Sequence, residues 1–390
     1  MKINQRIKTL VGSSTLAITA RAKELASQGK DVVNFGAGEP DFDTPEFIKK
    51  AALKAIESGF TKYTPSIGTP QLREAISQKF QKDNHLSYKP SQVAVSCGAK
   101  HSLYNIIQVL ADVGDEVIIP APYWVSYPEM VKLSGASSKI LTTTSAAKFK
   151  ITAQQLAQNI SKQTRILILN SPSNPTGMLY SKKELQEIAQ VCVQNKIYVI
   201  SDEIYEKLIY DTNEYVSIAS LGQEIYDLTV TVNGVSKAYS MTGWRIGYCG
   251  ASEEIISYIN KFQDHSTSNP ASISQAAALS ALQASEETIK PMRDEFRKRR
   301  DFMMTCLNRI PEITYVPPEG AFYIFCNISK LGDGNTIAKR ILDDVNVAVI
   351  PGDGFGAPEY IRLSFAASME RIEEGIKRIG EWIKKNYHGS

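Results

Sequence analysis

Residues 235–247 read VSKAYSMTGWRIG and follow an apolar, strand-like run at 228–232 after two intervening residues. This order places Lys237 at a strand-to-loop junction and Arg245 eight residues further on. A lysine held partly out of water can attack a carbonyl as a neutral amine and form a Schiff base. A nearby arginine offers a fixed fork of donors that suits a phosphate. Lys237 and Arg245 together predict a site for a phosphorylated aldehyde, such as pyridoxal phosphate. The alternative is that both are ordinary solvated charges of a surface loop.

Outward from this stretch, short apolar strands alternate with amphipathic helices from about residue 90. Ser181 and Glu184 form a capping box that predicts the start of one such helix. Repeated strand–helix units predict a mostly parallel sheet with helices on both faces. The expected strands are 93–95, 116–119, 166–169, 197–200 and 229–232.

Four chemically distinctive residues each follow one of these strands, namely Gly98, Asn174, Asp202 and Lys237. In sheets of this kind, ligands bind beyond the carboxyl ends of the strands. We therefore expect these residues to converge on one site.

The pattern changes after about residue 290, where a long charged helix precedes further strands. The basic cluster at 293–300 alternates with acids, which predicts a solvated helix face. We expect a large domain at 46–290 and a smaller α+β domain formed by 1–45 and 291–390.

Composition restricts the class of protein. The net charge of +3 and pI near 8.4 are too mild to predict a nucleic-acid partner. Since no apolar run approaches the length of a membrane span, we expect no membrane partner. The five cysteines are scattered, with no CxxC, which favours a reducing cytoplasm over disulfides or a zinc site.

Other residues suit a pyridoxal site. Asp202 could keep a pyridine nitrogen protonated, although it could also cap the next turn. Asn174 and Tyr205 could donate to a phenolate oxygen, and the small residues around Gly98 could expose helix N–H groups to a phosphate. Trp124 is a candidate stacking partner or a core residue.

Arg362 lies between Ile361 and Leu363 on an expected strand. It either clamps an α-carboxylate or points to solvent, and the pattern favours neither. Competing motifs fail, because Asp41 replaces the third glycine of a dinucleotide loop beginning at Gly36. The sequence contains no G-x-x-x-x-G-K, H-E-x-x-H or G-x-S-x-G.

Together these residues resemble the fold-type I pyridoxal-phosphate aminotransferases, an α/β class with a large cofactor-binding domain. More narrowly they resemble the bacterial-type aspartate aminotransferases of the subgroup that includes prephenate aminotransferases. The resemblance extends from about Arg6 to about Trp382. Its most specific stretches are GEPDF at 38–42, PYWVSYP at 122–128, NPTG at 174–177, DEIY at 202–205 and 236–247.

The resemblance implies a role for each site residue. Lys237 carries pyridoxal 5′-phosphate as a Schiff base and acts with Asp202 and Tyr205 in catalysis. The implied cofactor contacts are Gly98, Ala99, Trp124, Asn174, Asp202, Tyr205, Ser236, Lys237, Arg245 and a partner's Tyr63, hence a homodimer with shared sites. The implied substrate contacts are Thr15, Gly38, Lys100, Trp124, Asn174 and Arg362. Gly234 replaces a serine that holds the phosphate in many relatives.

Lys100 bears on the choice of reaction. In the resembled subgroup this lysine contacts the distal carboxylate of an acidic substrate, with Thr15 nearby. A positive charge in a first helical turn is otherwise mildly unfavourable. We therefore expect ping-pong transfer of an amino group from aspartate to 2-oxoglutarate. Prephenate or aromatic 2-oxo acids are the alternative acceptors, and a β-lyase is a further alternative. A transcription regulator is disfavoured because the family match starts near residue 6.

Overall fold

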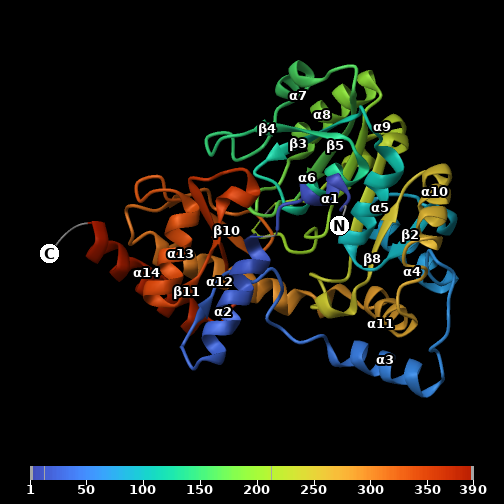
Figure 1. The fold of residues 1–390 in the computed structure, drawn as a ribbon. Coiled ribbons are helices and arrows are strands. Elements are labelled where there is room, and N and C mark those ends of the chain that lie inside the picture. Colours follow the sequence, from blue (N-terminus) through green and yellow to red (C-terminus); the bar gives the residue numbers. More distant parts are fainter. Residues whose placement is uncertain (1–2, 13, 212, 388–390) are drawn as a thin grey trace.

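The computed structural model describes residues 3–12, 14–211 and 213–387, and its largest sheet has seven strands (Figure 1). β8 runs antiparallel to both of its neighbours, β2 and β7, and the other neighbouring strands pair in parallel. The predicted mostly parallel sheet is therefore confirmed. In spatial order the strands are β2 (Val93–Ser96), β8 (Gly247–Gly250), β7 (Thr229–Gly234), β6 (Tyr198–Asp202), β5 (Thr164–Asn170), β3 (Glu116–Ala121) and β4 (Ser137–Thr142).

Helices cover both faces of this sheet, because each helix has one apolar stripe that must be buried. On one face, Leu103 of α5 (Ala99–Leu110) packs in the same core as Ile255 of α10 (Glu253–Asp264). On the other, Leu185 of α8 (Lys182–Asn195) packs with Ile225 of α9 (Gln223–Leu228). The predicted capping box is present, since the Ser181 N–H donates to Glu184 at 2.7 Å and the Glu184 N–H donates back at 3.4 Å. The other helices up to residue 290 are α1 (Gln5–Lys8), α2 (Ser14–Ser27), α3 (Glu46–Glu57), α4 (Pro70–Asn84), α6 (Ser126–Ser134), α7 (Ala153–Asn159) and α11 (Ser272–Leu282).

A second, antiparallel sheet follows α12 (Lys290–Leu307), in the order β12-β13-β10-β9. Its strands are β12 (Ile350–Pro351), β13 (Tyr360–Ser364), β10 (Tyr323–Asn327) and β9 (Thr314–Tyr315), and α13 (Gly334–Val345) and α14 (Met369–Tyr387) accompany it. The N-terminal segment joins this part of the fold, because β1 (Val33–Asn34) pairs in parallel with β11 (Val347–Ala348). Figure 1 shows α2 beside β11, where Leu25 packs with Ala348 from near the opposite end of the chain.

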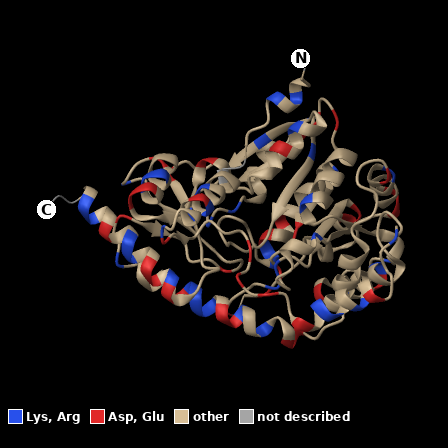
Figure 2. Ribbon diagram, turned by 60° about the horizontal axis from the view of Figure 1, so that its bottom comes forward, with Lys and Arg blue, Asp and Glu red and all other residues tan. Residues whose placement is uncertain are grey.

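Basic and acidic residues are interspersed along the ribbon in Figure 2. The expected solvated face of α12 is wrong for two of its arginines. Arg299 and Arg300 are buried and form ion pairs with Asp41 at 2.7 Å and Asp211 at 2.8 Å. Each arginine also pairs with a neighbouring acid, Arg299 with Glu295 at 3.0 Å and Arg300 with Asp301 at 2.7 Å. Asp41 and Asp211 lie far away in sequence, so the local charge pattern could not reveal the burial. Within the described residues, no helix has the length and apolarity needed to cross a bilayer.

Candidate active site

A cavity of about 390 Å³ lies where the carboxyl ends of the parallel strands meet the second sheet. Most of the residues predicted from the sequence line it: Thr15, Gly38, Ala99, Lys100, Trp124, Asn174, Asp202, Tyr205, Ser236, Lys237, Arg245 and Arg362. Gly98 lies beside Arg245 at its edge. Tyr63 does not line this cavity, and its side chain is 94% exposed.

Lys237 stands in the turn after β7, as predicted, with its side chain half-buried. Its ammonium donates a 2.6 Å hydrogen bond to the Gly38 carbonyl oxygen. Burial, together with the nearby positive charges of Arg245 and Arg362, lowers the pKa of the Lys237 amine to about 8, against the opposing effect of Glu39. Roughly a tenth of such amines are neutral at pH 7, so the side chain can act as a nucleophile or a base.

Asp202 ends β6 and is buried. The Tyr127 hydroxyl donates to its Oδ2 at 2.6 Å. Burial nevertheless raises the pKa of the Asp202 carboxyl to about 6, with the Tyr127 hydrogen bond acting in the opposite direction. A buried carboxylate of this kind is stabilised by a cationic N–H partner, which a protonated pyridine supplies. Sequence reasoning assigned no role to Tyr127, although it lies only three residues after Trp124.

Arg362 is only 2% exposed, which excludes the solvent-facing alternative. Its guanidinium donates to Asn174 Oδ1 at 2.9 Å and to the Gly36 carbonyl at 3.0 Å, and it lies 4.3 Å from the centre of the Tyr323 ring. Its Nε is buried without a hydrogen-bond partner, and no acid among the described residues forms an ion pair with it. A buried, unneutralised guanidinium fits a carboxylate ligand.

The turn before α5 forms a cradle against Arg245. Gly98 has φ +91°, and a Cβ there would lie 2.3 Å from Arg245 Nη2. Arg245 donates to the carbonyls of Thr242 at 2.9 Å and Cys97 at 3.4 Å. Ala99 and Lys100 begin α5, and the first N–H groups of a helix have no acceptor four residues earlier within it. This combination of N–H groups and guanidinium fits a phosphate.

Gly234 is packed against the backbone of the neighbouring strand. A Cβ there would lie 3.0 Å from the Ile246 carbonyl oxygen and 3.2 Å from Gly247 Cα. The nearest hydroxyl to Lys237 in the chain is that of Ser236, which is buried and lines the cavity.

Lys100 occupies a different part of the wall from Arg362. Its ammonium lies 4.8 Å from the centre of the Trp124 ring. Burial lowers the pKa of the Lys100 amine, and the positive charge of Arg245 adds to this effect. Trp124 is partly buried, with its ring edge-on to Tyr127 at 5.3 Å, and Thr15 lines the cavity from α2.

Two further residues that the sequence did not reveal hold the predicted ones. The hydroxyls of Tyr205 and Tyr323 are 2.9 Å apart. Asn170, which pairs with Asp202 in the sheet, accepts from the Asn174 N–H at 2.8 Å and donates to the Asp202 carbonyl at 2.9 Å. The only sequence signal for Asn170 is its place at the end of the strand next to that of Asp202.

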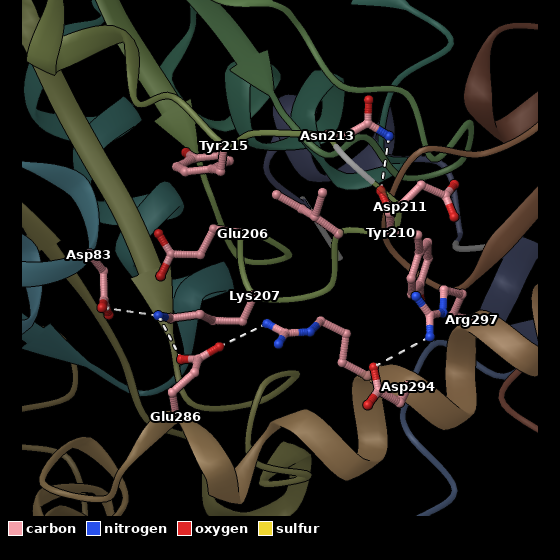
Figure 3. Close-up of a pocket in the computed structure, with 12 residues that line it drawn as sticks. Asp83, Glu206, Lys207, Tyr210, Asp211, Asn213, Tyr215, Glu286, Asp294 and Arg297 are labelled. Carbon is pink, nitrogen blue, oxygen red and sulfur yellow. Dashed lines mark hydrogen bonds and ion pairs between the residues drawn. The ribbon is translucent and has the colours of Figure 1, made fainter.

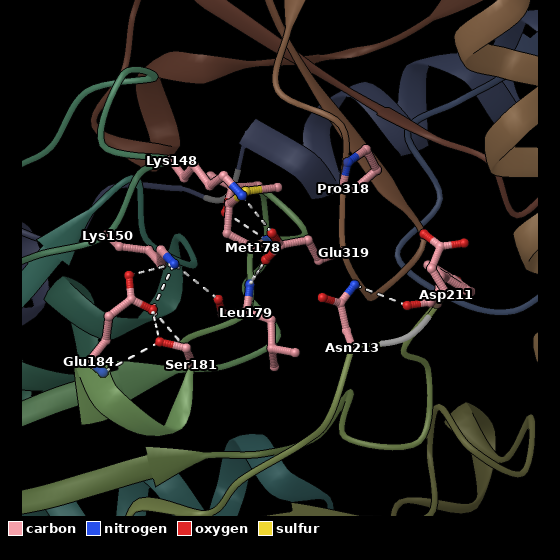
Figure 4. Close-up of polar contacts among 12 residues, drawn as sticks. Lys148, Lys150, Met178, Leu179, Ser181, Glu184, Asp211, Asn213, Pro318 and Glu319 are labelled. Atoms are coloured by element: carbon pink, nitrogen blue, oxygen red, sulfur yellow. Dashed lines mark hydrogen bonds and ion pairs between the residues drawn. The ribbon is translucent and has the colours of Figure 1, made fainter. Parts of the chain in front are cut away.

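The turn that carries Asn174 also contacts the segment around Glu319, as Figure 4 shows. One Glu319 oxygen accepts from the Leu179 N–H at 3.1 Å, and the other pairs with Lys148 at 3.0 Å. The Gly177 carbonyl accepts from both the Glu319 and Gly320 N–H groups. These contacts join the Asn174 turn to the segment that leads into β10.

A second hollow, shown in Figure 3, lies near Glu206, Lys207 and Tyr210. Its charges compensate one another, since Lys207 pairs with Asp83 at 3.0 Å and with Glu286 at 3.2 Å, and Arg293 pairs with Glu286 at 2.8 Å. The cavity around Lys237 differs, because Lys100, Arg245 and Arg362 form no ion pair with any described residue. Three unneutralised cations beside a reactive amine identify it as the candidate active site.

Comparisons with known proteins agree with this geometry. The sequence model for "Aminotransferase class I and II" matches residues 30–379. The chain is 49% identical to an aspartate aminotransferase of Bacillus sp. (strain YM-2), covering 97% of this chain and 98% of that one. It is 46% identical to a probable aspartate/prephenate aminotransferase of Aquifex aeolicus, covering 97% and 98%. A solved aspartate aminotransferase from Thermus thermophilus with maleate superposes with a TM-score of 0.95 at 40% identity, covering 98% and 99%. The chain belongs to the class I and II aminotransferases.

Proposed function

We propose that this protein transfers the amino group of L-aspartate to 2-oxoglutarate, giving oxaloacetate and L-glutamate. The reaction takes place in the cavity that contains the Lys237 amine. As a member of this family, the protein is a pyridoxal-phosphate-dependent transaminase. The observation that carries the choice of substrates is the placement of Arg362 and Lys100. Two cations without acidic partners line one cavity with the Lys237 amine, as a dicarboxylic substrate requires.

The cofactor fits the donor set of this cavity. Asp202 would face the ring nitrogen, Asn174 and Tyr205 the phenolate oxygen, and Trp124 the ring face. Gly98, Ala99, Ser236 and Arg245 would hold the phosphate. When bound, pyridoxal phosphate supplies an aldehyde for amines and a ring that withdraws electrons from the bonds of the substrate α-carbon.

The chain's own residues bind, orient and move protons. Arg362 would receive the α-carboxylate as a forked clamp, and Gly38 lines the same cavity at the α-carboxylate end of the substrate. Lys100, with Thr15 nearby, would receive the distal carboxylate. The Lys237 amine, once free and neutral, would act as a general base and accept the proton from the substrate α-carbon. It would then release this proton as a general acid.

Several relatives are named aspartate/prephenate aminotransferases, so prephenate is the second candidate acceptor. Prephenate also carries two carboxylates, and the placement of Arg362 and Lys100 suits it equally. An aromatic 2-oxo acid has one carboxylate and leaves Lys100 without a role. Rates with aspartate as donor and 2-oxoglutarate, prephenate or phenylpyruvate as acceptor separate the three possibilities.

We also propose a homodimer with shared active sites, to which the partner's Tyr63 contributes a phosphate contact. Exposed apolar side chains precede that residue in sequence, on α3 and just after it: Phe47, Leu53, Ile56 and Phe60. An exposed patch of this kind is typical of an interface. The pairing of β1 with β11 supports a division into a large domain at 46–290 and a small domain at 1–45 and 291–390. The free cysteines support a cytoplasmic location.

Lys237→Ala tests the proposed function. This variant should still bind the cofactor, but it should lose transamination between aspartate and 2-oxoglutarate by several orders of magnitude, because both the nucleophile and the base are absent. Lys261→Ala, which removes an exposed lysine on α10, is the matched control and should retain activity. Near-normal turnover by Lys237→Ala would overturn the assignment, as would wild-type elimination from β-substituted amino acids without transamination.

A further inference from the structure

The loop at 60–69 is fastened to its own subunit along its length, yet its Tyr63 side chain is 94% exposed. At its start, the Ser272 hydroxyl donates to the Phe60 carbonyl at 2.8 Å. Near its end, the Val95 N–H donates to the Ile67 carbonyl at 3.0 Å. Fixing a surface loop costs conformational entropy, so a loop held in this way suggests that the position of its exposed residue matters.

Two buried glutamines make the central attachments. Gln275 on α11 is 1% exposed and uses both ends of its amide. Its Oε1 accepts from the Thr69 N–H at 2.9 Å, and its Nε2 donates to Thr64 Oγ1 at 2.9 Å. It also donates to the Pro270 carbonyl at 2.8 Å. One side chain therefore holds the loop at two points, Thr64 and Thr69, and the first of these directly follows Tyr63.

Gln263 on α10 is fully buried and ties the loop to β2. Its Nε2 donates to the Ser66 carbonyl at 2.5 Å and to the Val95 carbonyl at 2.9 Å. Its Oε1 accepts from the Ser96 hydroxyl at 2.9 Å. Because β2 leads directly into Gly98, the loop is anchored to the strand that carries its own subunit's phosphate turn.

We propose that Gln263 and Gln275 are positioning residues for the partner's active site, because they hold the loop at 60–69 so that Tyr63 projects across the dimer interface. The inference rests on the proposed function, through its shared dimeric site. A purely structural pair of glutamines would support only its own subunit. A positioning pair acts in trans, on the cofactor bound to the other subunit.

Hybrid dimers distinguish the two roles. Each hybrid contains one subunit with Lys237→Ala, so that only one Lys237 remains to carry the cofactor. Gln275→Leu or Gln263→Leu is placed either in the subunit with the intact lysine or in the Lys237→Ala subunit. The apoenzyme hybrid is titrated with pyridoxal phosphate and treated with borohydride, and mass spectrometry measures the fraction of Lys237 that carries the cofactor.

The affinity for pyridoxal phosphate should fall about three- to tenfold when the glutamine variant is in the Lys237→Ala subunit. It should remain near the parental value when Gln275→Leu is in the other subunit. Gln263 also holds β2 of its own subunit, so for Gln263→Leu the loss should be larger when the variant is in the Lys237→Ala subunit than when it is in the other. Thr64→Val removes the hydroxyl that accepts a hydrogen bond from Gln275. It is a smaller change that tests the same contact if Gln275→Leu does not fold. Gln92→Leu is the matched control, because Gln92 donates to the Ala251 carbonyl and has no contact with the loop.

Tyr63→Phe separates failure of this inference from failure of the shared site. A trans defect for Tyr63→Phe, with none for Gln275→Leu and Thr64→Val, would overturn the role of the glutamines alone. Equal losses in both placements would make the glutamines merely structural. No trans defect for Tyr63→Phe would remove the shared site and this inference with it.

Discussion

The Arg362 guanidinium donates a 2.9 Å hydrogen bond to Oδ1 of Asn174, a residue 188 positions away in the chain. The contact joins β13 of the antiparallel sheet to the turn after β5 of the seven-stranded sheet. It aims one face of a buried cation into the cavity that also holds Lys237. The site is therefore built between the two sheets, and it depends on how they pack together.

Arg362→Lys should raise KM for every amino acid and 2-oxo acid substrate, because all of them carry an α-carboxylate and a lysine lacks the forked geometry. We expect kcat/KM for aspartate and for alanine to fall by a similar factor, roughly ten- to a hundredfold. Steady-state kinetics with both donors measures this, and Arg165→Lys at an exposed position is the control. A loss confined to aspartate would assign Arg362 to the distal carboxylate.

Lys100→Met should weaken only dicarboxylic substrates. The methionine keeps an apolar stem over Trp124 but removes the charge that would meet the distal carboxylate. The preference for aspartate over alanine, expressed as a ratio of kcat/KM values, should fall by roughly ten- to a hundredfold. If both donors weaken equally, Lys100 acts on the cofactor phosphate or on α5, and aromatic 2-oxo acids become as well supported as the dicarboxylic substrates.

Gly98→Ala should loosen the phosphate cradle. Gly98 has φ +91° and ψ 158°, a conformation nearly restricted to glycine, so alanine should cost about 1–3 kcal/mol of stability. The added Cβ would also displace Arg245 from the turn, which should weaken cofactor affinity. Thermal unfolding and cofactor titration of the apoenzyme measure the two effects. Gly243→Ala, where nothing lies within 4 Å of the new Cβ, should change neither.

Asp202→Asn should change how the stability of the apoenzyme depends on pH. Burial raises the pKa of the Asp202 carboxyl from 3.8 in the unfolded chain to about 6 in the fold. The folded state therefore binds more protons between these values, and its free energy of unfolding falls as pH rises through this window, by roughly 3 kcal/mol. Asp202→Asn removes the titrating group, so its stability relative to wild type should increase from about pH 4 to about pH 6.

Denaturant unfolding of the apoenzyme at several pH values measures this difference. Tyr127→Phe is the informative companion variant, because it removes a hydrogen bond that lowers the Asp202 pKa. As pH rises, the free energy of unfolding of Tyr127→Phe should therefore continue to fall up to a higher pH than that of wild type. A constant difference between Asp202→Asn and wild type at every pH would show that Asp202 is ionised throughout this range.

Local sequence determined the fold class, because hydrophobic periodicity and helix caps depend only on near neighbours. The strands at 116–119 and 166–169 and the Ser181 capping box could be predicted for this reason, with strand ends that extend further in the structure. The strand-end positions of Asn174, Asp202 and Lys237 could also be predicted. Their assigned roles came from residue chemistry and resemblance, and they remain predictions for the experiments above.

Tertiary structure alone decided which polar side chains are buried and what each one meets. Apolar neighbours around Arg362 are compatible with either face of a strand, and only the packing of Asn174 and Tyr323 buries it. The hydrogen bond from Tyr127 to Asp202 spans 75 positions, so no local pattern reveals it. The prediction that Arg299 and Arg300 lie on a solvated helix face is wrong for the same reason. Burial and ion pairing depend on contacts between distant segments, and these contacts also set the pKa values of Lys237 and Asp202.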